Sequence, residues 1–183
     1  MRVLNLGVFI MMCWVFFACK RQSNSGVDAS TWVVYELDDV WTFNAPKGTR
    51  LIYERGIDST PGYIILATND SLNLEFDSGF ESAAMDTVCN LGSEMVYAKQ
   101  RIARGNYKYL DKPDTLHQAR VDTINGLAVI MILPEKAGTG TTEVSISNCN
   151  SNRWLAIYGK NIPADKQELV LKIYASIRQA KIK

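Results

Sequence analysis

Residues 118–133 read Gln-Ala-Arg-Val-Asp-Thr-Ile-Asn-Gly-Leu-Ala-Val-Ile-Met-Ile-Leu, and this stretch decides the fold class of the chain. Asn125-Gly126 separates two strand-forming runs, and this residue pair accepts the positive φ angles of a two-residue hairpin turn. The run 127–133 has no polar alternation, so we expect a central strand that is covered on both faces. The stretch therefore predicts two antiparallel strands joined by a tight turn.

Further strand signals flank this hairpin as short runs rich in aromatic and β-branched residues. They predict strands at residues 32–35, 40–43, 50–54, 63–67, 72–76, 142–147 and 153–158, with turns at 44–48, 59–62, 68–71 and 148–152. Because a parallel crossover needs about a dozen residues or more, these short connections imply antiparallel neighbours. Residues 77–116 carry no regular pattern, and we expect them to be mostly irregular.

The last part of the chain changes to a helical period. Apolar residues recur at helical spacing from Leu169 to Ile177, and Pro163 suits a first helical residue. Arg178, Lys181 and Lys183 would lie at the negative end of this helix. We therefore predict an α+β fold, an antiparallel sheet of about 7–9 strands with a C-terminal amphipathic helix packed on one face.

The first residues indicate export. Residues 3–18 are almost entirely apolar, follow Arg2 and precede a polar run, which is typical of a signal peptide. The apolar block is shorter than the roughly 20 residues that a spanning helix needs. Sequence 16–19, Phe-Phe-Ala-Cys, resembles the lipobox of bacterial lipoproteins, which implies cleavage after Ala18 and a lipid on Cys19. An ordinary secretory signal that is cut elsewhere remains the alternative.

These observations divide the chain into a lipoprotein signal peptide (1–18), a flexible tether (19–30) and one globular domain (31–183). In lipoproteins of some bacteria, an acidic run after the lipidated cysteine resembles a surface-export signal. Lys20 and Arg21 stand there instead, so the resemblance implies a membrane-anchored domain that faces the periplasm of the cell envelope.

The composition narrows the classes of partner. Without residues 1–18 the chain carries 19 basic and 19 acidic residues, since only Arg2 is removed, and such a balance does not favour nucleic acid as a partner.

The two other cysteines of the domain, Cys89 and Cys149, would meet an oxidising compartment, where they form a disulfide or remain two separate thiols. No Cys or His stands near either at zinc-ligand spacing, so we expect no metal site and no cofactor.

Candidate catalytic and binding residues are few. His117 is the only histidine, and at the entry to a predicted strand we expect it to be a surface residue rather than a catalytic one. The glycine-rich segment 135–142 lacks the Gly-Lys-Ser/Thr ending of a phosphate loop and is expected to be a plain connection. A cation could be surrounded by the carboxylates of Asp38, Asp39, Asp111 and Asp114, although we expect these side chains to be exposed to solvent without a cation. The aromatic residues Trp41, Tyr107 and Tyr109 suit either partner contacts or core packing.

Several phrases of the chain resemble the PsbP-like fold of small secreted and lipid-anchored bacterial proteins. They are residues 43–48, 57–63, 124–128, 154–159 and 172–177. The resemblance implies a sheet backed by helices and a role in binding or assembly, and it transfers no site residues.

The sequence thus predicts a lipid-anchored envelope protein with a non-enzymatic binding or assembly role. We expect it to contact the membrane through its lipid and to have an envelope protein as partner. A small envelope hydrolase with a serine or carboxylate site is the alternative, and a ligand carrier with a cleft between sheet and helix is a third possibility.

Overall fold

The computed structural model describes residues 31–68, 72–80, 116–148 and 153–180, all of which belong to the predicted globular domain. The predicted signal peptide and tether, with Cys19, lie outside the described residues. Cys89 and Cys149 lie outside them too, so their pairing stays a prediction.

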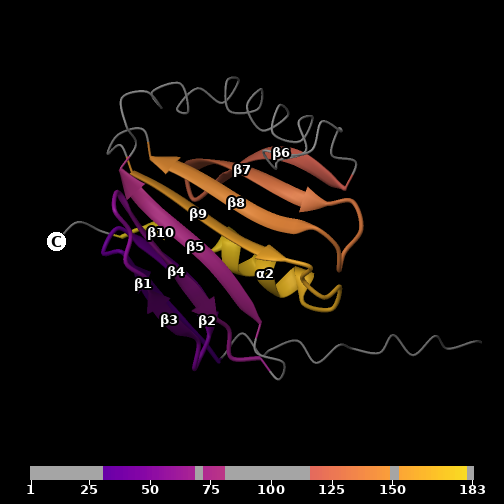
Figure 1. The fold of residues 1–183 in the computed structure, drawn as a ribbon, viewed down its shortest axis with the longest axis horizontal. Helices are drawn as coiled ribbons and strands as arrows, with labels where there is room; N and C mark the ends of the chain where they lie inside the picture. Colours follow the sequence, from indigo (N-terminus) through magenta and orange to yellow (C-terminus); the bar gives the residue numbers. More distant parts are fainter. Residues whose placement is uncertain (1–30, 69–71, 81–115, 149–152, 181–183) are drawn as a thin grey trace, which may run out of the picture.

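Seven strands form the larger sheet, which crosses the molecule diagonally in Figure 1 in the order β3-β4-β5-β9-β8-β7-β6. Their bounds are β3 (Arg50–Tyr53), β4 (Ser59–Ile65), β5 (Asn73–Phe80), β6 (His117–Ile124), β7 (Leu127–Pro134), β8 (Thr141–Asn148) and β9 (Arg153–Lys160). All neighbours are antiparallel, as the short connections predict. β5 and β9, far apart in the sequence, pair in the middle of the sheet.

A smaller sheet and a helix cover one face of the larger sheet. The smaller sheet has the order β1-β2-β10 and consists of β1 (Trp32–Leu37), β2 (Trp41–Pro46) and β10 (Arg178–Gln179). Helix α2 (Gln167–Ala175) lies behind the larger sheet in Figure 1 and contacts β2. The α+β class with a packed C-terminal helix is confirmed, but the expectation of one sheet is wrong. The β1–β2 hairpin lies across the face of the larger sheet, where it buries Trp41 and Phe43.

The hydrophobic core lies between the larger sheet and this second layer. Trp41, Phe43 and Tyr174 are among its largest side chains, and each is at most 1 % exposed. Full burial of one large apolar side chain contributes roughly 1.5–3 kcal/mol. Trp41 is therefore a core residue, and its alternative role in partner contacts is wrong.

Strand β7 is buried on both faces, as its apolar run predicts. Val129 and Met131 belong to the main core, whereas Ile130 and Ile132 form a second cluster with Ala119 on the opposite face. The turn before β7 is also confirmed, since Asn125 and Gly126 have φ angles of 51° and 83°. Because this residue pair accepts these angles without strain, it forms a two-residue turn, and the turn fixes which residues of β6 and β7 stand opposite each other.

Several predicted strand boundaries are wrong for one reason, which is pairing with neighbouring strands. β2 continues through Asn44–Pro46, so only the last part of the predicted turn 44–48 is a turn. β4 includes Pro61, although the sequence predicts a turn there. Proline has no N–H to donate, but the edge of β4 at Pro61 faces Glu54, one residue beyond the end of β3, so the β3–β4 pairing loses no hydrogen bond. β5 extends through Asp77–Phe80 because β4 and β9 pair with both of its edges there.

The C-terminal helix is shorter than predicted. It begins at Gln167, not at Pro163, and ends at Ala175. Ser176 donates a hydrogen bond to the carbonyl oxygen of Ile173 at 2.6 Å and accepts one from the Asn44 N–H at 2.8 Å. Asn125 donates to the carbonyl oxygens of Ala175 and Ile177. Arg178 does not lie at the end of the helix as predicted, because it belongs to β10 and pairs with Thr42 of β2. Lys181 and Lys183 lie outside the described residues.

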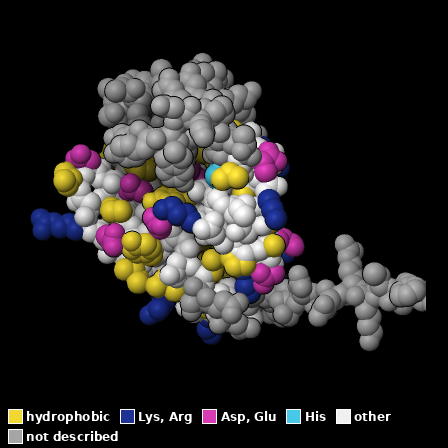
Figure 2. Space-filling model, turned by 45° about the vertical axis from the view of Figure 1, so that its right-hand side comes forward, with side chains coloured by type: hydrophobic (Ala, Val, Ile, Leu, Met, Phe, Trp, Pro, Cys, Tyr) yellow, Lys and Arg dark blue, Asp and Glu magenta, His cyan; other side chains and the backbone are white. Residues whose placement is uncertain are grey.

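The outer surface of the described residues carries apolar, acidic and basic side chains intermixed, as Figure 2 shows for one face. The only histidine, drawn in cyan, presents a small area in that view. Within the described residues, no helix has both the length and the apolar character needed to span a bilayer.

Candidate functional site

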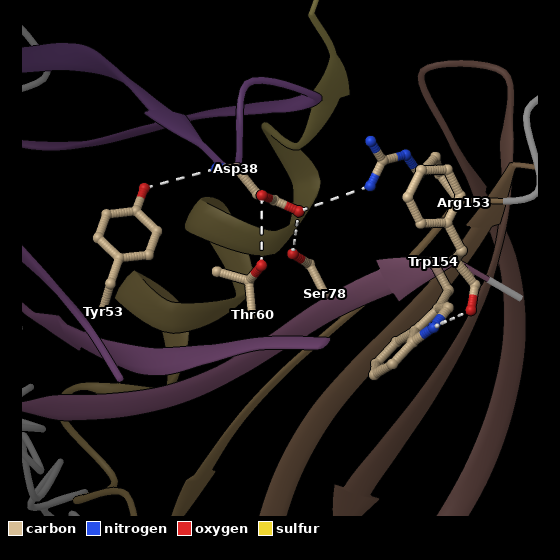
Figure 3. Close-up of polar contacts among 7 residues, drawn as sticks. Asp38, Tyr53, Thr60, Ser78, Arg153 and Trp154 are labelled. Atoms are coloured by element: carbon tan, nitrogen blue, oxygen red, sulfur yellow. Dashed lines mark hydrogen bonds and ion pairs between the residues drawn. The ribbon is translucent and has the colours of Figure 1, made fainter. Parts of the chain in front are cut away.

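Asp38 joins the turn between β1 and β2 to the larger sheet (Figure 3). Its φ angle is 53°, a left-handed conformation that Asp tolerates better than most residues. Its Oδ2 accepts a hydrogen bond from the Ser78 hydroxyl at 2.7 Å, and its Oδ1 accepts one from Thr60 at 3.4 Å. The Asp38 backbone N–H donates to the Tyr53 hydroxyl at 3.4 Å. These contacts fix the hairpin turn on strands β3, β4 and β5.

Arg153 extends this cluster toward the end of β5. Its Nη1 lies 3.8 Å from Asp38 Oδ2, and its guanidinium carbon lies 3.6 Å from the centre of the Phe80 ring. A guanidinium at that distance from an aromatic ring makes a cation–π contact. Trp154 Nε1–H donates to the Phe80 carbonyl oxygen at 3.3 Å. The backbone and ring of Phe80 are thereby both held by β9.

Exposed apolar side chains surround this cluster, and we call Tyr53, Ile57 and Phe80 the apolar patch. They are 49 %, 99 % and 65 % exposed. Tyr53 is linked to Phe80 through Asp38 and Arg153, as Figure 3 shows for the polar part of that chain. The Ile57 loop borders the end of β5, since a Cβ on Gly79 would lie 3.2 Å from the Asp58 carbonyl oxygen. Exposed apolar side chains with polar residues around them often mark interaction sites.

Carboxylates surround the apolar patch. Asp39, Glu54 and Asp58 are exposed in the β1–β2 and β3–β4 connections. Two guanidinium groups stand in the same region of the described structure, those of Arg55 and Arg153, and the second already pairs with Asp38. The patch therefore has an acidic rim, although the chain as a whole has a formal net charge of only +1.

His117 is not the surface residue that the sequence predicts. It is 8 % exposed, and its Nε2 accepts a hydrogen bond from the Thr141 backbone N–H at 2.6 Å. Gly140 packs directly against the ring, because a Cβ at that position would lie 2.3 Å from Nε2. The glycine-rich segment is thus the connection between β7 and β8, as predicted, and it covers the histidine.

A second polar group lies on the other face of the larger sheet. Glu75, Tyr158 and Glu143 stand directly opposite one another across β5, β9 and β8. Burial, followed by a hydrogen bond with Glu75 and the nearby charges of Glu75, Asp77 and Glu143, raises the pKa of Tyr158 to about 12. The tyrosine therefore stays protonated, and thus a hydrogen-bond donor, up to strongly alkaline pH.

Of the four carboxylates proposed around a cation, Asp38 and Asp39 belong to the described residues. Asp38 is engaged by Ser78, Thr60 and Arg153, and Asp39 is exposed. Asp111 and Asp114 lie outside the described residues, as do Tyr107 and Tyr109. Over residues 31–68, 72–80, 116–148 and 153–180, no three His, Cys, Asp or Glu side chains form a group that could hold a metal ion.

Sequence reasoning missed Ile57 and Phe80. Ile57 stands alone among Glu54, Arg55, Gly56, Asp58 and Ser59, and an apolar residue in so polar a connection is the signal that could have found it. Phe80 falls in a segment expected to be irregular, and it carries no comparable signal. The patch exists because the β3–β4 loop that carries Ile57 leads into Ser59, which pairs with Gly79 beside Phe80, and because the β1–β2 turn contacts both Tyr53 and β5 through Asp38.

The comparisons with known proteins supply no family for this chain. No protein-family model matches it, and no curated protein is significantly similar.

Proposed function

We propose that this chain is a lipid-anchored cell-envelope protein whose domain binds a partner protein or supports assembly, without catalysing a reaction. The apolar patch is the observation that carries the proposal. Ile57 is 99 % exposed, and Phe80 is 65 % exposed although Arg153 and Trp154 hold it in place. Aromatic and aliphatic side chains that are exposed and positioned by neighbours can be buried on binding at small entropic cost.

The envelope location is supported by the first 26 residues. The apolar block, the small residue at Ala18 and Cys19 favour lipid attachment, and Lys20-Arg21 favours a periplasm-facing domain. Two acyl chains would keep the domain at a bilayer, since each buried methylene contributes about 0.8 kcal/mol. We further propose a PsbP-like architecture, which the antiparallel sheet with its N-terminal hairpin and C-terminal helix supports.

The geometry of the polar residues argues against the hydrolase alternative. His117 is 8 % exposed, and its Nε2 already accepts a hydrogen bond from the Thr141 N–H, so this nitrogen is not available as a base for a nucleophile. The Ser78 hydroxyl is within hydrogen-bond reach of a carboxylate but is 0 % exposed, so no substrate can reach its oxygen. A non-enzymatic role therefore fits these groups better than hydrolysis.

Site-specific photo-crosslinking in cells tests the binding role. A benzophenone amino acid replaces Ile57 in the full-length protein, and the same replacement at the exposed Glu135, in the β7–β8 connection, is the control. We expect one discrete adduct from position 57 that disappears with Phe80→Ser, and none from position 135. No adduct, or equal adducts from both positions, would contradict the proposed role.

Cys19→Ser tests the location. This substitution removes the thiol that would carry the lipid, so we expect the protein to leave the membrane fraction. Mass spectrometry of the wild-type N-terminus gives the second readout. A wild-type terminus without acyl chains, or an unchanged membrane fraction for the variant, would contradict lipid anchoring.

A further inference from the structure

The rim of the apolar patch indicates the class of partner. Of the charged groups that the described structure places around Tyr53, Ile57 and Phe80, four are carboxylates (Asp38, Asp39, Glu54 and Asp58) and two are guanidinium groups (Arg55 and Arg153). Asp38 and Arg153 pair with each other at 3.8 Å, which leaves three carboxylates and one cation. A partner that covers the patch must therefore meet an excess of negative charge.

We infer that the apolar patch binds a basic polypeptide segment that presents an apolar side chain flanked by Lys or Arg. This inference rests on the proposed binding function and adds the chemistry of the partner. The apolar side chain would be buried against Ile57 and Phe80. The flanking cations would lie over Glu54 and Asp58 on one side and over Asp39 on the other. Such complementarity speeds association and excludes acidic partners.

A membrane surface is the other occupant that an exposed isoleucine and phenylalanine could suggest. Lipid surfaces of bacterial envelopes that carry net negative charge would repel the carboxylates of the rim, because a charged side chain near such a surface experiences its potential. Proteins that bind these surfaces place Lys and Arg around their apolar side chains. The rim of this patch has the opposite sign, so the observations favour a basic polypeptide.

The patch is also held in shape before any partner arrives. The Ser78–Asp38 hydrogen bond at 2.7 Å connects β5 to the β1–β2 turn, and the Arg153–Phe80 contact at 3.6 Å connects β5 to β9. Gly56 allows the chain to turn sharply before Ile57, since a Cβ there would lie 1.9 Å from the Ser59 carbonyl oxygen. A preorganised surface loses little conformational entropy when it binds.

Binding of three synthetic peptides to the lipid-free full domain tests the inference. The peptides place Leu residues among Lys, Ser or Glu residues, and affinity is measured by fluorescence anisotropy. We expect the Lys peptide to bind at least about tenfold more tightly than the Ser peptide, and the Glu peptide to bind most weakly. Raising the salt concentration from about 0.1 M to about 1 M, which shortens the Debye length from about 10 Å to about 3 Å, should weaken the Lys peptide most.

Matched variants locate the binding. Ile57→Ser and Phe80→Ser should each weaken the Lys peptide about tenfold, whereas Val34→Ser should not, although Val34 at 66 % is as exposed as Phe80. Glu54→Gln with Asp58→Asn should remove most of the salt dependence, and Glu135→Gln should not change it. Because these side chains are exposed, circular dichroism melts should show all variants folded.

Each other outcome has a definite meaning. Equal, salt-independent binding of the Lys and Ser peptides that still needs Ile57 would overturn the basic partner but keep the binding function. Binding of anionic lipid vesicles that is lost with Ile57→Ser would assign the patch to a membrane and overturn the inference. Peptide binding unaffected by every patch variant, together with no crosslink from position 57, would overturn both proposals.

Discussion

The Asp38 side chain should hold the two sheets together, and substitutions at this position give the sharpest test of the structure. Loss of the carboxylate in Asp38→Ala leaves the Ser78 hydroxyl, which is 0 % exposed, without its acceptor at 2.7 Å. An unsatisfied buried polar group costs about 1–3 kcal/mol. The Arg153 pair, with both side chains 24 % exposed, adds at most about 1 kcal/mol. Alanine at a φ of 53° adds about 1 kcal/mol more.

These contributions predict that Asp38→Ala lowers the free energy of unfolding by about 3 kcal/mol. Asp38→Gly removes the same hydrogen bonds without the steric cost of a Cβ, so it should be less harmful by about 1 kcal/mol. Asp38→Asn retains one acceptor and tolerates the left-handed conformation, so its cost should be about 1 kcal/mol. Urea denaturation at pH 7, followed by circular dichroism, measures all three values.

A double-mutant cycle isolates the Asp38–Ser78 hydrogen bond. Ser78→Ala alone should cost about 1 kcal/mol, and the two substitutions together should cost less than the sum of their separate effects, by about 1 kcal/mol or more. Additive effects would refute the reasoning, and so would an Asp38→Asn variant that is as unstable as Asp38→Ala. Either result would mean that packing, not this hydrogen bond, positions the hairpin.

Three further predictions concern the sheet and the helix. Because the pKa of Tyr158 is raised to about 12, its neutral form stabilises the fold below the ordinary value of 10.0, and this contribution should be lost as the pH rises from 10 to 12. Urea denaturation at pH 9 and at pH 11.5 should show this loss in the wild type and a smaller one in Tyr158→Phe; equal losses would contradict it. Gly62→Ala should destabilise the domain by about 2–4 kcal/mol, since its Cβ would lie 2.2 Å from the Ile52 carbonyl oxygen. Gly126→Ala, with no atom within 4 Å of the added carbon, should cost only about 1 kcal/mol at a φ of 83°, and similar thermal shifts for the two would count against this packing. Tyr174→Phe should cost about 1–2 kcal/mol in the same denaturation assay, because its buried hydroxyl donates to the Thr142 carbonyl oxygen at 3.0 Å, and an unchanged midpoint would argue against that bond.

Much of the fold could be predicted from the sequence because its signals are local. Asn125-Gly126 accepts a conformation that few other residue pairs accept, and this pair defines the two strands on either side of it. The helical spacing of Val170, Ile173 and Tyr174 likewise identified the face that α2 buries. These features depend on neighbours within a few residues, which is why a single sequence was enough.

The boundaries of the elements could not be predicted in the same way. The helix stops at Ala175 because Ser176 binds Asn44 and because Asn125 binds the last carbonyl groups, and these partners come from two distant hairpins. Pro61 can lie inside β4 because β3 ends at Tyr53, which stands opposite Gly62. No residue of β3 therefore needs a hydrogen bond from position 61. A turn signal describes what a residue prefers, whereas pairing on both edges decides what it adopts.

The candidate site shows the same division. By itself, the sequence determined the strand-rich class, the tight hairpin turn and the amphipathic helix, since each is written in consecutive or periodic residues. Only the tertiary structure decided that His117 is buried under Gly140 and that Tyr53, Ile57 and Phe80 share one surface. Those residues come from separate strands and loops, and the register of the strands between them sets which side chains meet.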